Sequence, residues 1–477
     1  MSIWEDFPIK KICCLGAGYV GGPTMAVIAD KCPHLKVTVL DINEERIIQW
    51  NNTNLDRLPV FEPGLKDVIQ RVRGRNLFFS TEIESVIAES QMVFISVNTP
   101  TKTKGFGAGY ASDLKWVEAS ARQVAKYSRN HTIVVEKSTL PVKTAQVIKD
   151  ILKNSVDESI EKSDRNTFSI LSNPEFLAEG TAIHDLKNPD RVLIGGDDFD
   201  SINLLKTVYK DWVPEDKIIT TNLWSSELSK LTANAFLAQR ISSINSISAI
   251  CEVTGAEVNE VSGAVGFDTR IGSKFLSSGP GFGGSCFKKD ILNLVYLSRH
   301  YGLKEVAEYW EQIIKINNWQ KKRISRLIVE KLYGTVTLKK IVILGFAFKA
   351  NTNDTRESPA ISIVKDLLEN GAEIIISDPK VKSCQISKDL KLEENHKELN
   401  SEFGYWKFSK DIYEAVQDSD AIVLLTEWNE YKDLDWRRIS KKMRSPSWVF
   451  DTRSISNHKE IKKAGLNIWC LGKGEIN

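Results

Sequence analysis

A cysteine inside a glycine-rich segment is the first residue of this sequence that could carry covalent chemistry. Cys286 follows a run of small residues and precedes Lys288, Lys289 and Asp290. A thiol at a helix N-terminus beside two lysines has a lowered pKa and more thiolate. Asp290, one helical turn further on, could act on a neighbouring water or hydroxyl. A buried, inert cysteine is the competing interpretation, and the local sequence does not decide between the two.

A lysine and an asparagine with helical spacing form a second candidate group. Lys230 and Asn234 are four residues apart in a segment with helical periodicity, so both project from one face of a helix. Asparagine is unfavourable inside a helix unless its side chain has another role. An ammonium and an amide that converge on one point would stabilise an oxyanion. The alternative is a solvated helix face.

A glycine-rich turn follows the first apolar run and predicts a dinucleotide site. The motif G-x-G-x-x-G is formed by Gly16, Ala17, Gly18, Tyr19, Val20 and Gly21. Pro23 suits the first turn of a following helix, and Asp41 ends the next apolar run 20 residues after Gly21. Such glycines let the backbone approach a pyrophosphate at a helix N-terminus. Asp41 would bind the ribose hydroxyls and repel a 2′-phosphate, which favours NAD over NADP. A turn without a ligand is the alternative.

Polar residues also follow two later apolar runs. Glu175 and Glu179 lie in a loop after one run, and Ser138 and Thr139 end another. Either pair could be a helix cap. Both pairs, however, lie where an open parallel sheet places its ligands, beyond the carboxyl ends of its strands.

The elements that position these residues form an α/β pattern that occurs twice. Short apolar runs alternate with helix-length intervals over residues 1–222 and again over 335–477, and residues 223–334 have helical spacing. We therefore expect two Rossmann-like, doubly wound parallel-sheet domains joined by a central helical connector. The second half has a single glycine in Gly345-Phe346-Ala347-Phe348-Lys349. It therefore predicts either a different nucleotide, with Lys349 and Arg356 as cations, or a repeat without a ligand.

Composition excludes several classes of protein. Of the 477 residues, 42% are hydrophobic and 26% charged, as in ordinary globular proteins. The 64 Lys and Arg nearly cancel the 62 Asp and Glu, so we expect no nucleic acid or membrane partner. No apolar run reaches the ~20 residues that cross a bilayer, and the start does not resemble a secretory signal. Seven cysteines without CxxC or Cys/His spacing predict no metal site and a reducing, cytoplasmic location.

Several ordered motifs together resemble one enzyme family. The segments GAGYVGGP, FISVNTPTKT, EKSTLPV, SNPEFLAEGTA, GPGFGGSCFKKD and GFAFK followed by DTRES are similar to those of the UDP-glucose 6-dehydrogenases, within the nucleotide-sugar dehydrogenases. The amino-acid sequence of the middle segments is most similar to that of the animal branch. The resemblance implies an NAD-binding domain over residues 1–222, a connector and dimerisation region with the cysteine loop over 223–334, and a UDP-sugar-binding domain over 335–477.

The resemblance also implies a four-electron oxidation of UDP-glucose to UDP-glucuronate, a precursor for polysaccharide synthesis, with two NAD per sugar. Cys286 would add to the intermediate aldehyde as a thiohemiacetal and then hold a thioester that water hydrolyses. Lys230 and Asn234 would stabilise the oxyanion. Asp290 and Glu175 would manage protons and water, and Thr139 would assist through a bound water.

Binding residues are carried over by their positions in the matching motifs. Those for NAD are Gly16, Ala17, Gly18, Tyr19, Val20, Gly21, Asp41, Arg46, Val97, Asn98, Thr99, Pro100, Thr101, Ser138, Glu179 and Arg356. Those for the UDP sugar are Glu175, Phe176, Leu177, Ala178, Glu179, Lys230, Asn234, Arg270, Phe282, Gly283, Phe348, Lys349 and Arg453. Arg270 would reach a neighbouring subunit, which implies at least a dimer and, in the animal branch, a hexamer inhibited by UDP-xylose.

Three positions depart from the family pattern. Thr452 stands where glycine is common, Tyr110 replaces an expected arginine, and the segment before Glu62 is a few residues longer than usual. Two other functions stay open. One is a sister enzyme for UDP-N-acetylmannosamine or GDP-mannose, and the other is a catalytically dead relative that binds nucleotide sugars. The intact Cys286, Lys230 and Asp290 argue against the latter.

Overall fold

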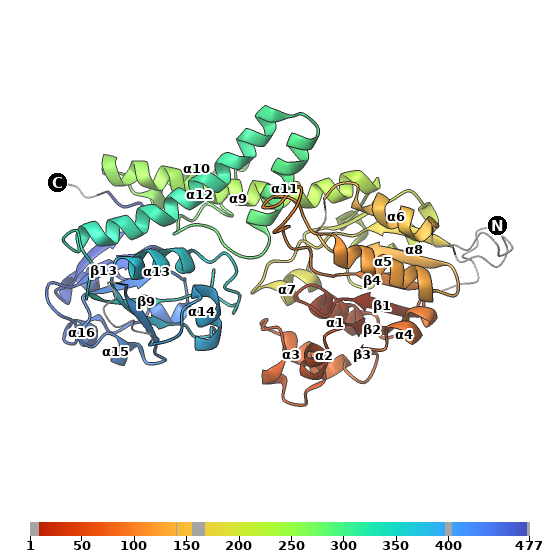
Figure 1. Ribbon diagram of the computed structural model, residues 1–477, viewed down its shortest axis with the longest axis horizontal. Coiled ribbons are helices and arrows are strands. Elements are labelled where there is room, and N and C mark those ends of the chain that lie inside the picture. Colours follow the sequence, from red (N-terminus) through yellow and green to blue (C-terminus); the bar gives the residue numbers. More distant parts are fainter. Residues whose placement is uncertain (1–8, 140, 155–166, 396–402, 475–477) are drawn as a thin grey trace. The chain divides into compact units, whose positions relative to one another are not determined.

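The computed structural model describes residues 9–139, 141–154, 167–395 and 403–474 of the chain. The chain divides into two compact units: Met1–Ala233 with Leu292–Gly302, and Asn234–Ile291 with Leu303–Asn477. Each unit contains one β-sheet with helices packed against it (Figure 1).

The sheet of the first unit contains eight strands in the order β3-β2-β1-β4-β5-β6-β7-β8. The strands are β1 (Lys11–Leu15), β2 (Lys36–Leu40), β3 (Leu77–Ser80), β4 (Met92–Ile95), β5 (Thr132–Glu136), β6 (Phe168–Ser172), β7 (Val192–Gly196) and β8 (Ile218–Thr221). Their first six positions follow the 3-2-1-4-5-6 order of a dinucleotide-binding sheet. The predicted doubly wound fold is therefore confirmed.

One pair in this sheet is not parallel. β6 and β7 pair antiparallel over a short stretch, with Leu171 opposite Gly196 and Ser172 opposite Gly195. β8 then runs parallel to β7. The last two strands thus run in the direction opposite to the other six. Apolar runs alone could not predict this reversal, because a buried strand has the same apolar sequence pattern in either direction.

Helices connect and cover these strands. They are α1 (Gly21–Lys31), α2 (Glu44–Asn51), α3 (Leu65–Val72), α4 (Ile83–Glu89), α5 (Lys115–Tyr127), α6 (Thr144–Asn154), α7 (Ala182–Lys187) and α8 (Phe199–Lys210), with short 3₁₀ turns η1 (Leu55–Arg57) and η3 (Glu215–Lys217). Every residue of β4 and β5 is buried. This burial on both faces explains why the strands read as continuous apolar runs rather than alternating ones.

The sheet of the second unit repeats the same topology. Its strands are β9 (Lys340–Leu344), β10 (Glu373–Ser377), β11 (Tyr405–Phe408), β12 (Ala421–Leu424), β13 (Trp448–Asp451) and β14 (Asn467–Cys470). They lie in the order β11-β10-β9-β12-β13-β14, and all pairs are parallel. The accompanying helices are α13 (Pro359–Glu369), α14 (Ser383–Leu390), α15 (Ile412–Ala415), α16 (Trp436–Ser440) and α17 (His458–Lys463), with the 3₁₀ turn η4 (Asn429–Tyr431). The predicted second α/β pattern is confirmed.

The segment between the two sheets is helical, as expected. It contains α9 (Leu223–Thr254), α10 (Val258–Gly266), α11 (Phe287–His300) and α12 (Lys304–Lys331). The two compact units divide within α9 and α11, and the three-part division with boundaries at 222/223 and 334/335 stays a prediction. Among the residues that the structure describes, no helix has the length and hydropathy to cross a membrane.

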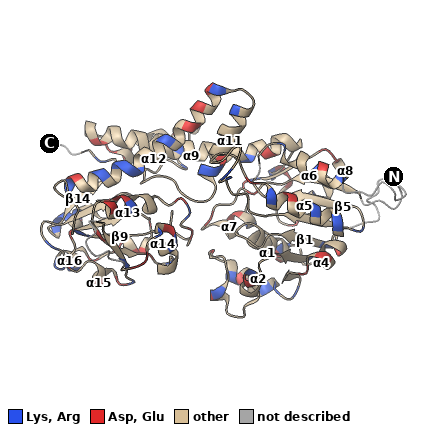
Figure 2. Ribbon diagram, in the orientation of Figure 1, with Lys and Arg blue, Asp and Glu red and all other residues tan. Residues whose placement is uncertain are grey.

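Charged residues of both signs are distributed over the helices of each unit. Figure 2 shows Lys and Arg interspersed with Asp and Glu. This distribution agrees with the near-zero net charge of +2.

In the second unit, an aspartate after β10 holds the turn that follows β9. One carboxylate oxygen of the buried Asp378 accepts the backbone N–H groups of Phe346 and Ala347 at 2.7 and 3.0 Å. The other oxygen accepts those of Lys380 and Val381 at 2.8 and 2.9 Å. Backbone donors therefore occupy both oxygens, and the role of this side chain is structural.

We expect Asp378→Ala to lower the free energy of unfolding of the second unit by roughly 2–4 kcal/mol, because buried backbone donors would lose their acceptor. The urea midpoint, followed by tryptophan fluorescence, measures the change. Asp433→Ala, at an exposed position, is the matched control and should leave the midpoint unchanged. Equal midpoints for both variants would contradict this role.

Candidate active site

Glycines after β1 create an open turn at the centre of the first sheet. Gly16 has φ +109°, and a Cβ atom there would lie 2.3 Å from the carbonyl oxygen of Ser96, beyond the end of β4. A Cβ on Gly21 would lie 2.0 Å from the Gly16 oxygen, so α1 packs closely against the turn. A Cβ on Gly18 would meet no heavy atom within 4 Å. The backbone at Gly18 is therefore open to a ligand at the start of α1, as a pyrophosphate requires.

Asp41 lies next to this turn, where the sequence predicted a ribose-binding carboxylate. It is 9% exposed and accepts hydrogen bonds from the backbone N–H of Ala17 and of Asn43, each at 2.9 Å. The Arg46 guanidinium, which is partly exposed, also donates to Asp41 at 3.0 Å. The fold thus brings three predicted cofactor residues together, and the open glycine turn beside a fixed carboxylate fits the adenosine half of NAD.

The ends of β4 and β5 are joined by hydroxyl groups. Ser138 Oγ donates to the carbonyl oxygen of Val97 at 2.8 Å, and Thr99 Oγ1 donates to that of Thr139 at 3.1 Å. The structure therefore brings these four predicted residues together. The neighbouring Asn98 and Pro100 are exposed, and Thr101 forms an isolated antiparallel bridge with Ser112.

A buried ion pair, which sequence analysis missed, orients Glu175. Lys137 Nζ lies 3.0 Å from Glu175 Oε2, and the lysine side chain is 2% exposed. Lys137 also donates to Asn173 Oδ1 at 3.0 Å and to the Tyr209 hydroxyl at 3.2 Å. Burial alone would lower the pKa of Lys137, but the Glu175 carboxylate and the Tyr209 hydroxyl together outweigh burial and raise that pKa to about 12. The pair keeps Glu175 ionised: burial opposes the charge, but Lys137 lowers the pKa of the carboxyl.

The segment after Glu175 is placed by aromatic and backbone contacts. The ring of Phe176 lies close to two cations, with the Arg191 guanidinium carbon 3.8 Å and Lys230 Nζ 5.1 Å from the ring centre. Leu177 packs against the core of the sheet, and the Ala178 N–H donates to an Asp185 carboxylate oxygen at 2.9 Å. The structure thus places the buried Lys230 beside the predicted substrate segment; Glu179, further along it, is partly buried.

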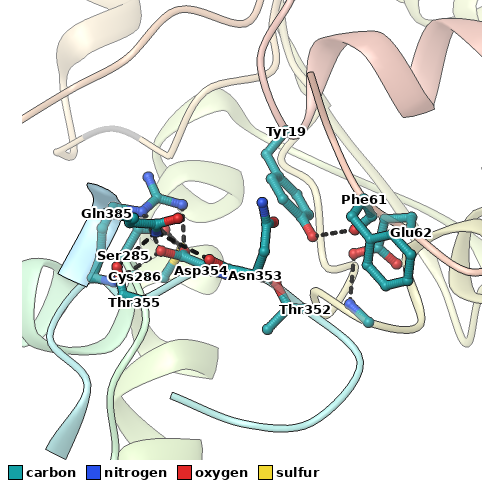
Figure 3. Close-up of polar contacts among 12 residues, drawn as sticks. Tyr19, Phe61, Glu62, Ser285, Cys286, Thr352, Asn353, Asp354, Thr355 and Gln385 are labelled. Carbon is teal, nitrogen blue, oxygen red and sulfur yellow. Dashed lines mark hydrogen bonds and ion pairs between the residues drawn. The ribbon is translucent and has the colours of Figure 1, made fainter. Parts of the chain in front are cut away.

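The segment longer than the family pattern also contributes to this region. It contains η1 and leads to Glu62, which is 4% exposed. Glu62 accepts the N–H groups of Gly180 and Ala182 at 2.5 and 3.1 Å, next to the start of α7. The Tyr19 hydroxyl donates to the Phe61 carbonyl oxygen at 2.8 Å (Figure 3). Glu62 therefore anchors the end of the segment that begins at Glu175, a role for which the sequence offered no local signal.

A pair of buried carboxyl groups lies at the start of α6. Glu227 on α9 accepts the N–H groups of Lys143 and Ala145 at 2.7 and 2.8 Å. Burial raises the pKa of the neighbouring Glu136 well above its usual range, and Glu227 raises it further. Burial also raises the pKa of Glu227. These groups anchor the helix that follows Ser138 and Thr139, and both were missing from the sequence-based predictions.

In the second unit, Cys286 immediately precedes α11 and is partly exposed. Its sulfur lies 3.4 Å from Ser285 Oγ. The Asp290 N–H donates to the Cys286 carbonyl oxygen at 2.9 Å, so the predicted helical turn joins the two. Asn234 Nδ2 donates to Asp290 Oδ2 at 2.5 Å, and the Asp290 side chain is fully buried. The fold therefore brings Asn234 and Asp290 into direct contact.

Both lysines after Cys286 are paired with carboxylates. Lys288 Nζ lies 2.9 Å from one Glu357 carboxylate oxygen, and Lys289 Nζ lies 3.7 Å from Asp290 Oδ1. The sequence predicted that these cations act on the thiol. Their pairing with carboxylates does not test this expectation, which stays a prediction.

The loop before Cys286 packs against the segment after β9. A Cβ on Gly283 would lie 2.7 Å from the Glu357 carbonyl oxygen and 2.8 Å from Phe348 Cβ, so only glycine fits. The Gly284 N–H donates to the Arg356 carbonyl oxygen at 2.8 Å. Four predicted residues are thus neighbours here: Phe282, Gly283 and Phe348 for the substrate and Arg356 for NAD.

The remaining predicted cations of this unit occupy different environments. Lys349 Nζ lies 5.5 Å from the ring centre of Phe348. Arg356 is exposed, and its guanidinium pairs with the Asp354 carboxylate. Figure 3 shows Asp354 beside Thr355, whose hydroxyl accepts a hydrogen bond from Gln385. Arg270 is 87% exposed and pairs with Asp268.

Arg453 follows the end of β13, and its side chain reaches the segment after β9 that contains Phe348. Its guanidinium donates to the carbonyl oxygens of Leu425 at 2.9 Å and Phe348 at 3.1 Å. Thr452 is buried, and its hydroxyl donates to the Leu424 carbonyl oxygen at 2.5 Å. The departure from glycine at position 452 is therefore accommodated by a hydrogen bond, and Arg453 stays next to Phe348. The other departure, Tyr110, packs its ring 4.9 Å from the Arg299 guanidinium carbon.

One group of potential metal ligands occurs in the described residues of this unit, where the sequence predicted none. One ligand atom each of Asp451, His458 and Cys470 lies within 4.8 Å of the others. Asp451 already accepts hydrogen bonds from the N–H groups of Arg453 and Ser456. These bonds give the carboxylate a structural role in holding the Arg453 turn.

Three models of one protein family match the chain. They describe the UDP-glucose/GDP-mannose dehydrogenase family: its NAD binding domain over residues 10–213, its central domain over 224–319 and its UDP binding domain over 342–458. The matches cover the glycine turn, the cysteine loop and the segment after β9.

Relatives with established names span nearly the whole chain. UDP-glucose 6-dehydrogenase 4 of Arabidopsis thaliana is 54% identical over 475 residues, 97% of each chain. UDP-glucose 6-dehydrogenase of Gallus gallus is 54% identical over 473 residues, 98% of this chain and 94% of the relative. Identity does not separate the plant branch from the animal branch. A solved UDP-glucose dehydrogenase from the hyperthermophilic archaeon Pyrobaculum islandicum superposes with a TM-score of 0.82 at 27% identity, over 99% of both chains.

We expect Gly18→Ala to leave the fold intact and to weaken NAD binding by about tenfold or more, about 1.4 kcal/mol, because the methyl group would occupy the open side of the turn. Isothermal titration calorimetry with NAD and a thermal unfolding curve measure the two effects. Gly263→Ala in α10, where a Cβ also meets nothing within 4 Å, is the control. Unchanged NAD affinity in Gly18→Ala would argue against a pyrophosphate at this turn.

Lys137→Met should lower the free energy of unfolding by roughly 3–5 kcal/mol, because Glu175 would keep a buried charge without its partner. The control Lys149→Met removes an exposed ion pair with Asp197 and should cost less than about 1 kcal/mol. Urea midpoints compare the two variants. The double variant Lys137→Met/Glu175→Gln should recover part of the loss, and no recovery would contradict the pairing as its cause.

Proposed function

Because this chain belongs to the UDP-glucose/GDP-mannose dehydrogenase family, we propose that it is an NAD-dependent oxidoreductase that converts UDP-glucose to UDP-glucuronate. The observation that carries this proposal is the 54% identity to UDP-glucose 6-dehydrogenases over at least 97% of the chain. The product would supply polysaccharide synthesis. The intact cysteine loop and glycine turn support an active enzyme rather than a sensor.

Cys286 is the proposed nucleophile. The C6 alcohol of the sugar would first lose its hydroxyl proton and a hydride to give an aldehyde. The thiolate sulfur of Cys286 then adds to the aldehyde carbon, and the carbonyl oxygen becomes the oxyanion of a thiohemiacetal. Loss of hydride from that carbon leaves a thioester, and water then releases the carboxylate and restores the thiol. NAD, when bound, supplies the hydride acceptor, and the balance of four electrons needs two NAD per sugar.

Four side chains of the chain would assist these steps. Lys230 and Asn234 donate to the oxyanion, and the contact between Asn234 and Asp290 fixes the orientation of the amide. Asp290 would take the proton of a hydroxyl or water. Glu175, kept ionised by Lys137, would manage water together with Thr139.

The cofactor would be held by the first unit. The Gly18 turn and the start of α1 would take the pyrophosphate, and Asp41 would bind the ribose in competition with Arg46. A 2′-phosphate beside Asp41 would meet a buried negative charge, which favours NAD over NADP. Ser138, Thr99 and their neighbours at the ends of β4 and β5 would line the remainder of the cofactor site.

The UDP sugar would be bound in part by the second unit. Phe282 and Gly283, which pack against Phe348, would line this part of the substrate site. Lys349 and Arg453 would supply positive charge beside them. Phe176, Leu177, Ala178 and Glu179 contribute from the first unit, as the family resemblance implies.

Assembly, regulation and location follow from the family. We infer a homo-oligomer, at least a dimer and up to a hexamer, in which the exposed Arg270 reaches a partner's substrate. UDP-xylose would act as a feedback inhibitor. A cytoplasmic location stays the expectation for a chain with seven free cysteines.

Excess NAD and a known amount of UDP-glucose should yield about two NADH per sugar, since the aldehyde is oxidised before release. Absorbance at the nicotinamide band and chromatography of UDP-glucuronate measure the ratio. About one NADH per sugar would mean that an aldehyde leaves the enzyme and would refute the covalent step. Turnover of UDP-N-acetylmannosamine or GDP-mannose in preference to UDP-glucose would replace the substrate assignment.

Cys286→Ser is the matched variant for this measurement. It should abolish UDP-glucuronate formation and still bind NAD, because most of the proposed cofactor residues lie in the first unit and Cys286 is not one of them. Cys384→Ser, at an exposed free cysteine, should retain full turnover.

A further inference from the structure

A buried lysine on α12 has no partner in the part of the chain that the structure describes. Lys321 is 7% exposed, and none of the described residues forms a hydrogen bond or ion pair with its ammonium group. Burying an unpaired charge costs several kcal/mol. Such a group is retained most readily where an anion binds beside it.

The contacts of Lys321 place it under the loop that leads to Cys286. A Cβ on Gly281 would lie 3.4 Å from both Cγ and Cε of Lys321, so the lysine stem runs along the backbone at Gly281. One turn earlier on α12, Asn317 binds both the N–H and the carbonyl oxygen of Phe282, at 2.8 and 3.1 Å. Gln320 donates to the Gly279 oxygen at 2.9 Å. The helix therefore fixes Lys321 against the loop that carries Phe282 and Gly283.

The charged groups around Lys321 do not neutralise it. Glu357, after β9, and Lys288, on α11, are the charged side chains that act on it. Both Glu357 carboxylate oxygens accept hydrogen bonds from Lys288, at 3.0 and 2.9 Å. Burial lowers the pKa of Lys321 to about 8, and the opposing effects of Glu357 and Lys288 leave it there. The ammonium therefore loses its proton near pH 8 unless another anion stabilises it.

We propose that Lys321 is a binding residue for the diphosphate of the nucleotide sugar, which its ammonium contacts from beneath the loop at Gly281 and Phe282. This inference rests on the proposed function, which places a UDP sugar at Phe282 and Gly283. The diphosphate is the group of such a substrate with the charge to match the ammonium of this buried side chain. Lys321 would add to Lys349 and Arg453 a cation that the sequence motifs do not include.

The proposal predicts proton uptake on binding. An anion stabilises the charged form of Lys321, so its pKa rises in the complex. Below about pH 7 the free protein already carries the proton, and no uptake occurs. At pH 8, close to the free pKa, about half a proton should be taken up per ligand, and above pH 8 the affinity should fall by up to about tenfold per pH unit.

The experiment is calorimetric titration of the full chain with UDP-glucose without NAD, at pH 6.5 and pH 8, in two buffers of different ionisation enthalpy. Wild type should show uptake at pH 8 alone. Lys321→Met should bind about 10- to 100-fold more weakly at pH 6.5 and show no uptake at either pH. Lys321→Arg should keep most of the affinity but show no uptake, because its guanidinium does not titrate in this range.

Lys322→Met, at the next and exposed position of α12, is the matched control and should behave as wild type. Unfolding curves check that each variant is folded. Uridine, which lacks phosphate, should bind wild type and Lys321→Met equally.

Unchanged affinity and uptake in Lys321→Met, or equal weakening toward uridine, would overturn the proposal. If wild type fails to bind UDP-glucose, the proposed substrate is wrong. In that case, titration of wild type and the Lys321 variants with UDP tests the role of Lys321 independently of the sugar.

Discussion

In each unit, the turn after the first strand packs directly against the end of the fourth strand, and the rest of each site is arranged around this contact. At Gly16 a Cβ would lie 2.3 Å from the Ser96 oxygen, and at Gly345 it would lie 2.3 Å from Thr426 Cβ. Both glycines have positive φ, +109° and +95°. Two strands that end side by side in a parallel sheet leave no room for a side chain between them, so the turn must be glycine and the next helix starts at the ligand edge.

The same scaffold supports different chemistry because the surrounding side chains differ. In the first unit Asp41 accepts two backbone N–H groups and a partly exposed arginine, so part of its charge can be offered to a ligand. In the second unit Asp378 is occupied by backbone donors, and the buried Phe346 follows the glycine. A repeated fold therefore does not imply a repeated ligand. Only the first turn is open to a dinucleotide.

Buried charges around the site are held in specific pairs. Lys137 and Glu175 form an ion pair, and Asp290 accepts the Asn234 amide. Each pairing reduces the cost of burial and fixes the direction of a side chain. The paired groups are consequently rigid, and the unpaired Lys321 stands out against them.

The local features of this protein could be predicted from its sequence alone. Apolar runs indicated both sheets, the glycine spacing and Asp41 indicated the cofactor turn, and the four-residue spacing of Cys286 and Asp290 gave a single helical turn that the structure contains. These features depend on neighbours within one turn or one strand, where backbone geometry leaves few choices.

Which distant groups meet depends on how the whole chain folds. Lys137 reaches Glu175, Glu62 binds Gly180 across 118 residues, and Asn234 binds Asp290 across 56. The lysines after Cys286 were expected beside the thiol, but the fold pairs them with carboxylates. Such contacts depend on how elements pack and on which buried charges must be neutralised there. Neither is encoded in the spacing of residues along the chain, so the sequence could name the candidates but not their partners.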